Sequence, residues 1–167
     1  MSVDFVQKIT DEKKKLRELT FNVYTTSCFD EKSNNGSYSF CIIDRYEKKS
    51  TIIEQVESVN KTSIELIPIL ESIKYIINIT PNISRQYICI NLNSTSLYSV
   101  NIIREWLNKW ILDEDTENKF SDRPNYKILG EIHKLISNIK FNIKWVQKST
   151  NEITWAIDRK VNEKIFE

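Results

Sequence analysis

The residue types that most often carry chemistry in proteins are sparse in this sequence of 167 residues. The three cysteines, Cys28, Cys41 and Cys89, are odd in number and widely spaced, a pattern that indicates neither a disulfide framework nor a zinc site. The only histidine, His133, lies among residues of an apolar helical stripe that take the inner face, so we expect its side chain to be solvated. These residues therefore predict no zinc centre.

Four tryptophans have side chains that could stack on nucleic-acid bases. Trp106 and Trp110 are four residues apart in a predicted helix, and Trp145 belongs to an alternating strand, so packing in the core or at its edge is the favoured interpretation. Trp155 lies off the apolar stripe of the last predicted helix. It is the best candidate for an exposed aromatic side chain.

The charge balance gives no global support for phosphate binding. Twenty-four basic and 23 acidic side chains leave a net charge of +1, whereas proteins that bind nucleic acid through its phosphates usually carry a basic excess. Hydrophobic residues make up 40% of the chain and charged residues 28%, as in globular proteins. We find no signal-peptide pattern and no apolar stretch of ~20 residues, and therefore expect a cytoplasmic or other intracellular protein without a membrane contact.

The hydrophobic periodicity predicts strands followed by alternating helices and strands. Strand-like segments lie at 19–26, 37–44, 50–57, 86–92 and 141–146. Helical segments lie at 4–18, 63–79, 96–112, 126–139 and from Thr150 or Asn151 to Phe166, with candidate N-caps near Asn60 for the second of these. Asn34-Asn35-Gly36 predicts a tight bend between the first two strands. This order predicts an α/β fold with a five-stranded mixed sheet, in which three antiparallel strands precede parallel crossovers and helices cover both faces.

Short motifs also follow one another in an informative order after residue 19. They are Val23-Tyr24-Thr25-Thr26-Ser27-Cys28, Gly36-Ser37-Tyr38, Lys61-Thr62-Ser63-Ile64-Glu65-Leu66, Ser94-Thr95-Ser96-Leu97-Tyr98, the pair Trp106 and Trp110, Trp145-Val146, and Ala156-Ile157-Asp158. In order and spacing they resemble the motifs of the type 1 ribonuclease H family. The resemblance covers nearly the whole chain after residue 19 and implies a ribonuclease H-like domain over 19–167, preceded by a helical extension at 1–18.

The resemblance also implies where the family's metal site would fall. That site consists of four carboxylates, and the matching positions are occupied by Thr26, Glu65, Thr95 and Asp158. Two acids are retained and two are replaced by threonine. The family's histidine-bearing loop matches residues 148–151, which contain no histidine, and the family's asparagine pair at the helix start is absent.

These replacements predict a loss of hydrolytic activity. A two-metal nuclease holds Mg²⁺ ions roughly 3.5–4 Å apart, and anionic oxygens must offset the repulsion between them. A threonine hydroxyl is a neutral donor, so Glu65 and Asp158 alone would hold at most one loosely bound Mg²⁺ or Mn²⁺, and no cofactor is expected. Asp30, Asp44 and Glu152 are the other acids that could take part by migration.

The leading hypothesis is a catalytically inactive ribonuclease H-like module that acts as a nucleic-acid-binding or scaffolding subunit. Bacterial members of the family have a basic extension after the tryptophan-bearing helix, whereas residues 113–117 here are acidic and would repel phosphate. The candidate nucleic-acid-binding residues are Lys144, Lys148, Arg159, Lys160 and Trp155. Two alternatives are a divergent metal-dependent enzyme that cleaves RNA in RNA–DNA hybrids, and a purely protein-binding subunit of a viral or replication complex. A protein partner is expected in the leading reading as well.

Overall fold

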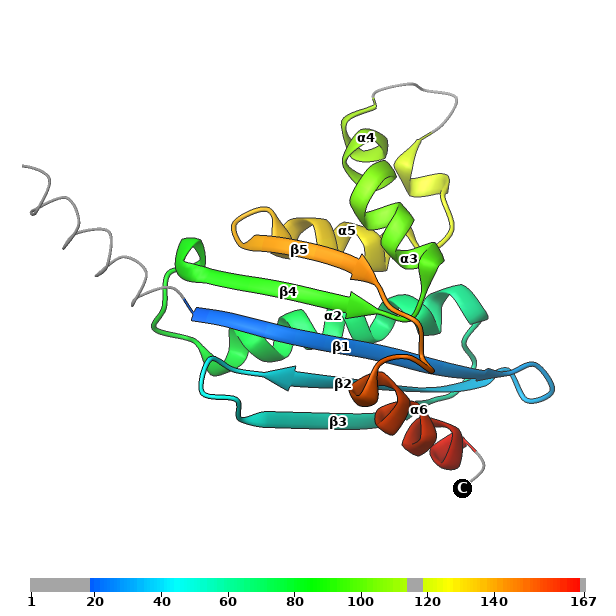
Figure 1. The fold of residues 1–167 in the computed structure, drawn as a ribbon. Helices are drawn as coiled ribbons and strands as arrows, with labels where there is room; N and C mark the ends of the chain where they lie inside the picture. The colour runs from blue at the N-terminus through cyan, green and yellow to red at the C-terminus, as the bar shows by residue number, and fades with distance from the viewer. Residues whose placement is uncertain (1–18, 114–118, 166–167) are drawn as a thin grey trace, which may run out of the picture.

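The computed structural model describes residues 19–113 and 119–165, and a five-stranded mixed sheet forms its centre (Figure 1). The strands are β1 (Leu19–Asp30), β2 (Asn35–Ile43), β3 (Lys49–Val56), β4 (Ile88–Ser94) and β5 (Lys140–Trp145). Their order across the sheet is β3-β2-β1-β4-β5. The first three strands pair antiparallel, whereas β4 pairs parallel to both β1 and β5. The predicted mixed sheet is therefore confirmed.

Helices cover both faces of the sheet, as predicted. The helices are α2 (Lys61–Ile79), α3 (Leu97–Asn101), α4 (Leu107–Leu112), α5 (Tyr126–Ile136) and α6 (Glu152–Ile165). The long helix α2 packs against β1 and β2 on one face and against α5, while α6 packs against β1, β2 and β3 on the opposite face (Figure 1). Alternate strand residues such as Val23, Ile90 and Leu92 are buried with Ile69 and Ile73 of α2.

Helix α2 begins where its capping residue predicts. The Asn60 side chain accepts from the Ser63 backbone N–H, and the Ser63 hydroxyl accepts from the Asn60 N–H, which together form a capping box. Pro68 lies inside the helix with its ring buried. This start fixes the position of Glu65 in the second turn of α2.

Several details of the secondary structure differ from the sequence-based expectation. The chain reverses at residues 31–34 instead of at Asn34-Asn35-Gly36, with Asn34 in the left-handed region at φ 57°. Gly36 already belongs to β2, and a Cβ there would lie 2.7 Å from Ile64 Cγ1, so glycine permits the close approach of α2. Helix α5 ends at Ile136 and not at the predicted residue 139, and Ser137 donates to the His133 carbonyl there.

The predicted helix 96–112 is interrupted by a π-helical turn, η2 (Ile102–Trp106). The Leu107 N–H donates to the Ile102 carbonyl, one residue further back than in an α-helix. Apolar spacing does not reveal such a bond, because buried residues recur at nearly the same interval on both sides of it.

Two short 3₁₀ turns complete the described chain, η1 (Arg85–Tyr87) and η3 (Phe120–Asp122). The helical extension predicted at 1–18 lies outside the described residues, as do most of the acidic segment 113–117 and the last predicted helical residue, Phe166. No described helix is both long enough and apolar enough to span a membrane.

Candidate functional site

The candidate site lies where the parallel strands β1 and β4 stop pairing and diverge. The two strands are in parallel register up to Thr25 and Ser94, and the Thr95 N–H then donates to the Thr25 carbonyl at 3.2 Å. From there β4 leads into α3, while β1 continues beside β2. Ligand sites in α/β sheets form at such carboxyl ends, where neighbouring chains diverge.

A chain of hydroxyl groups occupies this point of divergence. The Thr95 hydroxyl donates to Thr26 Oγ1 at 3.2 Å, and the Thr26 hydroxyl donates to Asp158 Oδ1 at 3.2 Å. Thr26 is buried, with 2% of its surface exposed, so this hydroxyl has little access to water. Helix α6, which carries Asp158, is thereby joined to the centre of the sheet.

Asp158 also contacts a cation from its own chain. Lys148 Nζ lies 3.1 Å from Asp158 Oδ1 and donates to the Ser27 carbonyl at 3.1 Å. The Asn162 amide donates to Asp158 Oδ2 at 3.2 Å, and its carbonyl accepts from the Cys28 thiol. The carboxylate is therefore satisfied by an ammonium, an amide and a hydroxyl. We refer to Thr95, Thr26, Asp158, Lys148 and Asn162 as the hydroxyl–lysine network.

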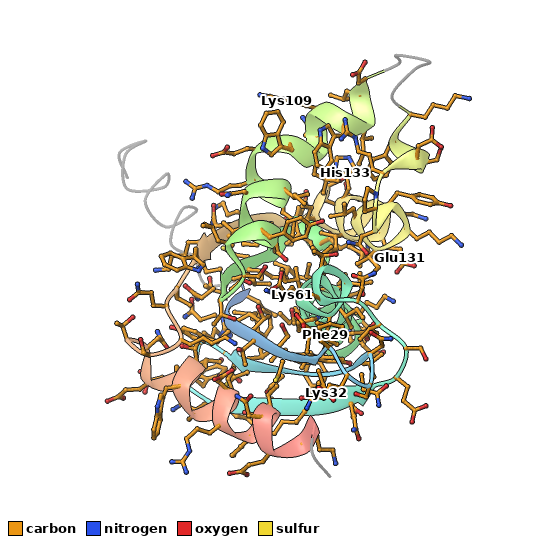
Figure 2. All side chains as sticks on the ribbon, turned by 90° about the vertical axis from the view of Figure 1, so that its right-hand side faces the viewer. Phe29, Lys32, Lys61, Lys109, Glu131 and His133 are labelled. Carbon is orange, nitrogen blue, oxygen red and sulfur yellow. The ribbon has the colours of Figure 1, made fainter. Side chains whose placement is uncertain are left out.

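Glu65 joins this region through a different hydroxyl. Its Oε2 accepts from the Ser96 hydroxyl at 2.9 Å, and Ser96 is also the N-cap of α3. Glu65 and Lys148 line a pocket of about 240 Å³ whose other walls are Ser27, Cys28, Phe29, Glu31, Lys61 and Ile64. Figure 2 looks onto this end of the sheet and labels Phe29 of β1 and Lys61 at the start of α2.

The thiol in this pocket is held in its protonated form. Burial raises the pKa of Cys28 above its ordinary value, and the carboxylates of Asp158 and Asp30 act in the same direction, while the Lys148 ammonium opposes them. A protonated thiol can donate to the Asn162 carbonyl, as the structure has it. Cys28 is therefore poorly suited to act as a nucleophile near neutral pH.

The donor set does not fit a pair of divalent cations. Two of the four positions that the resemblance assigns to the metal site carry neutral hydroxyls, and Asp158 forms an ion pair with Lys148. Within residues 19–113 and 119–165, no three His, Cys, Asp or Glu side chains converge as metal ligands would. The three other acids considered lie elsewhere, with Asp30 bound to Ser33 in the hairpin, Asp44 in the β2–β3 turn and Glu152 at the start of α6.

The predicted nucleic-acid-binding residues lie in three places. Lys148 belongs to the pocket, and α6 carries the exposed Lys160 together with Trp155, whose ring lies 5.1 Å from the Arg159 guanidinium carbon. Trp155 is 51% exposed, as its position off the apolar stripe predicts. Lys144 instead lines a pocket over β1, β4 and β5. It lies beside a hydrogen-bonded row of Asn22, Asn91 and Asn142, one from each of these strands.

The prediction that the other three tryptophans pack in the core or at its edge holds for Trp110 alone, because Trp106 is 47% and Trp145 43% exposed. Trp106 stacks on Trp110 with ring centroids 6.4 Å apart. The guanidinium carbon of Arg123 lies 4.0 Å from the centroid of the Trp110 ring. Trp145 donates from Nε1 to the Thr95 carbonyl at 3.3 Å and so supports the start of the hydroxyl chain. The indole of Trp145 thus helps to hold the backbone of Thr95, a contact that the alternating pattern of its strand does not predict.

Sequence reasoning did not identify Ser96 or Asn162 as members of the site. Asn162 lies four residues after Asp158 on α6, so helical spacing could have pointed to it. Ser96 carries no such signal, because its contact with Glu65 joins residues 31 positions apart.

Comparison with known proteins gives a family and several similar folds. A family model described as RNase H matches residues 18–158. Solved structures similar to this chain include LC9-RNase H1, described as a type 1 RNase H with the type 2 active-site motif, at 12% identity and a TM-score of 0.66, covering 87% of this chain and 70% of that one.

Two further structures come from named organisms. The N-terminal RNase H domain of Rv2228c from Mycobacterium tuberculosis, solved as a fusion with maltose-binding protein, has 9% identity, a TM-score of 0.65 and coverage of 89% and 94% of the two chains. RNase H1 from the halophilic archaeon Halobacterium salinarum NRC-1 has 10% identity, a TM-score of 0.62 and coverage of 87% and 98%. No curated protein matches the sequence. At such identities the likeness to these structures concerns the fold.

Proposed function

Because the chain belongs to the RNase H family, we propose that it is a non-hydrolytic member whose site binds nucleic acid without divalent metal ions. The proposal rests on the contact between Lys148 and Asp158, 3.1 Å from Nζ to Oδ1. In a metal-dependent site such a carboxylate would face a dication. Here its negative charge is balanced by a cation from the same chain.

Electrostatics explain why this balance opposes metal binding. An incoming Mg²⁺ must give up water molecules, displace Lys148 and accept the neutral oxygens of Thr26 and Thr95 as ligands. For a second ion beside the first, Glu65 would be the one further carboxylate among the four positions that the resemblance assigns to the metal site. The repulsion between two dications would then have too little negative charge to offset it.

The pocket beside the network offers groups suited to a phosphate backbone. Lys61 and Lys148 come from opposite sides of it, and the Ser27 hydroxyl adds a neutral donor. Glu31 and Glu65 reduce the local positive charge, so we expect modest affinity that falls steeply with salt. Trp155 and Arg159 on α6 provide a second contact region for a longer ligand.

A binding measurement with a fluorescent RNA–DNA hybrid tests the proposal. We expect the same dissociation constant in EDTA and in Mg²⁺. Lys148→Met should weaken binding about fivefold and lower the salt slope by about 1, because one phosphate contact is lost. Lys127→Met is the matched control, since Lys127 is an exposed lysine on α5. Equal affinities for both variants, or no hybrid binding at all, would contradict the proposal.

A hydrolysis assay with the same hybrid tests the enzymatic alternative. We expect no turnover above background in either Mg²⁺ or Mn²⁺. Turnover that Glu65→Gln abolishes would instead identify a divergent ribonuclease H, because only a working metal site would depend on that carboxylate.

A further inference from the structure

One cavity in the described chain lies away from the hydroxyl–lysine network, between β3 and α2. It is a groove of about 600 Å³. Tyr38 and Phe40 of β2 lie at its buried side, and Tyr75 of α2 meets the Phe40 ring at 5.9 Å. Ile52 and Val56 of β3 add apolar surface along the other side. We call this cavity the β3–α2 groove.

The groove runs beside an edge of the sheet. Strand β3 pairs with β2 through all eight of its residues, and no described strand pairs with its other side. Alternate residues of such a strand direct their N–H and C=O groups outward, where they can pair with another chain. The edge contains no proline, and its lysine, Lys49, is at the first position, so its later residues lack two usual protections against strand addition.

The charge of the groove is negative. Glu54 and Glu71 both line it, and the one lysine there, Lys74, lies 3.7 Å from Glu71 and 3.2 Å from Glu131 of α5. Hydrogen bonding to Glu131 raises the pKa of Lys74, so this ammonium is fully engaged with carboxylates. Glu54 has no comparable cation in the groove and is exposed. A basic side chain on a ligand would therefore be attracted here.

We infer that the β3–α2 groove binds an extended peptide segment of a protein partner, with apolar side chains at alternate positions and a lysine or arginine beside Glu54. The segment adds to β3 as a sixth strand. Its outward-facing backbone supplies the missing hydrogen bonds, and every second side chain points towards Ile52, Val56 and Tyr75. The inference concerns a surface distinct from the nucleic-acid site and does not depend on it.

A synthetic peptide tests the inference on the full chain. The probe has the length of β3, eight residues, with valine and threonine alternating between terminal lysines. Titration followed by amide NMR signals should shift resonances of β3 and of the groove-lining part of α2, with a dissociation constant of about 100 μM or lower. The same peptide with alternate backbone nitrogens methylated keeps its side chains but loses strand pairing, and we expect no binding.

Paired variants test the charge contribution. Glu54→Lys should weaken peptide binding about tenfold, whereas Glu57→Lys, the same charge change at an exposed residue outside the groove, should change it less than about twofold. Unfolding curves of both variants establish that they are folded. A peptide with terminal glutamates should not bind.

Several outcomes would overturn the inference. They are shifts confined to β5 or to the hydroxyl–lysine network, equal loss in both charge variants, undiminished binding of the methylated peptide, and no binding of the lysine-ended peptide to the unmodified chain. Displacement of the peptide by an RNA–DNA hybrid would also assign it to the other site. Weaker hybrid binding by Lys148→Met with unchanged peptide binding would support two separate surfaces.

Discussion

The hydroxyl–lysine network and the β3–α2 groove differ in how far the fold satisfies their polar groups. In the network, the Asp158 carboxylate has three donors from its own chain, among them the Lys148 ammonium. In the groove, Glu54 and the outer backbone of β3 have no such partners among the described residues. The carboxylate of Asp158 is thus satisfied within the chain, whereas the β3–α2 groove presents polar groups without such partners. Ligands are more readily attracted to groups that folding leaves without partners.

The largest expected effect comes from placing a carboxylate inside the network. Thr26→Asp puts a second buried negative charge next to Asp158, and we expect a loss of about 3 kcal/mol in the free energy of unfolding, measured by urea denaturation in EDTA. Mn²⁺ should restore part of this loss, because the added carboxylate creates a metal ligand.

Thr26→Val is the matched control for that variant. It removes the same hydroxyl without adding charge, so it should cost about 1 kcal/mol and show no response to Mn²⁺. If Thr26→Asp is as stable as the unmodified chain in EDTA, a second carboxylate beside Asp158 is not destabilising, which contradicts the electrostatic account of the network.

A second prediction concerns Gly36, which lies where β2 meets the start of α2. A Cβ at this position would stand 2.7 Å from Ile64 Cγ1, so Gly36→Ala should destabilise the protein by about 2 kcal/mol through overpacking. It should also disturb both regions, because β2 carries Tyr38 and α2 carries Glu65. Thermal denaturation measures the loss.

Gly130→Ala in α5 provides the contrast. There the new Cβ would meet only Phe120, at an ordinary distance of 3.6 Å, and helix propensity favours alanine by about 1 kcal/mol. A stability loss equal to that of Gly36→Ala would show that close packing is not the cause.

A smaller effect should appear in the reactivity of Cys28. Its raised pKa keeps the thiolate scarce, so the alkylation rate should reach half of its maximum only at a pH above the ordinary cysteine value of 9.0. Lys148→Met removes the ammonium that lowers this pKa and should move the profile to still higher pH. Mass spectrometry of the Cys28 peptide measures the rate, and an unchanged profile would argue against the Lys148 position.

The smallest effect concerns Tyr38 in the groove. Burial, with Glu71 and Glu54 contributing, raises its pKa to about 12 from 10.0. Between these values the unfolded chain has released this proton and the folded chain has not, so the contribution of Tyr38 to stability falls as the pH rises from 10 towards 12.

Phenolate absorbance measured against Tyr38→Phe isolates this titration from that of the other tyrosines. Glu71→Gln removes a negative charge and should lower the Tyr38 pKa slightly, because burial is the larger cause. A rise of this pKa in Glu71→Gln would contradict the electrostatics assigned to the groove.

Much of the fold could be predicted because its signals are local. Asn60 and Ser63 are three residues apart, so the capping box that starts α2 is readable in the sequence, as is the exposure of Trp155 on α6. The partner of Asp158 is not readable in this way. The Thr26–Asp158 bond joins residues 132 positions apart, and it exists only once α6 has packed on the sheet.

Family resemblance placed Thr26 and Thr95 together, but the lysine that completes the network had no such guide. Lys148 was predicted to bind nucleic acid, but the contacts of its ammonium with Asp158 and the Ser27 carbonyl were not predicted. Whether the ammonium of a lysine whose side chain is 44% exposed turns inward or outward depends on distances that only the folded chain defines.

The position of Lys148 has a consequence for the mechanics of the molecule. One ammonium ties the segment after β5 both to the backbone of β1 and to the carboxylate of α6. A phosphate arriving in the pocket would compete with Asp158 for that ammonium. A ligand bound there would remove one polar link between α6 and the sheet, while the buried side chains of Ile157 and Val161 would still hold the helix in place.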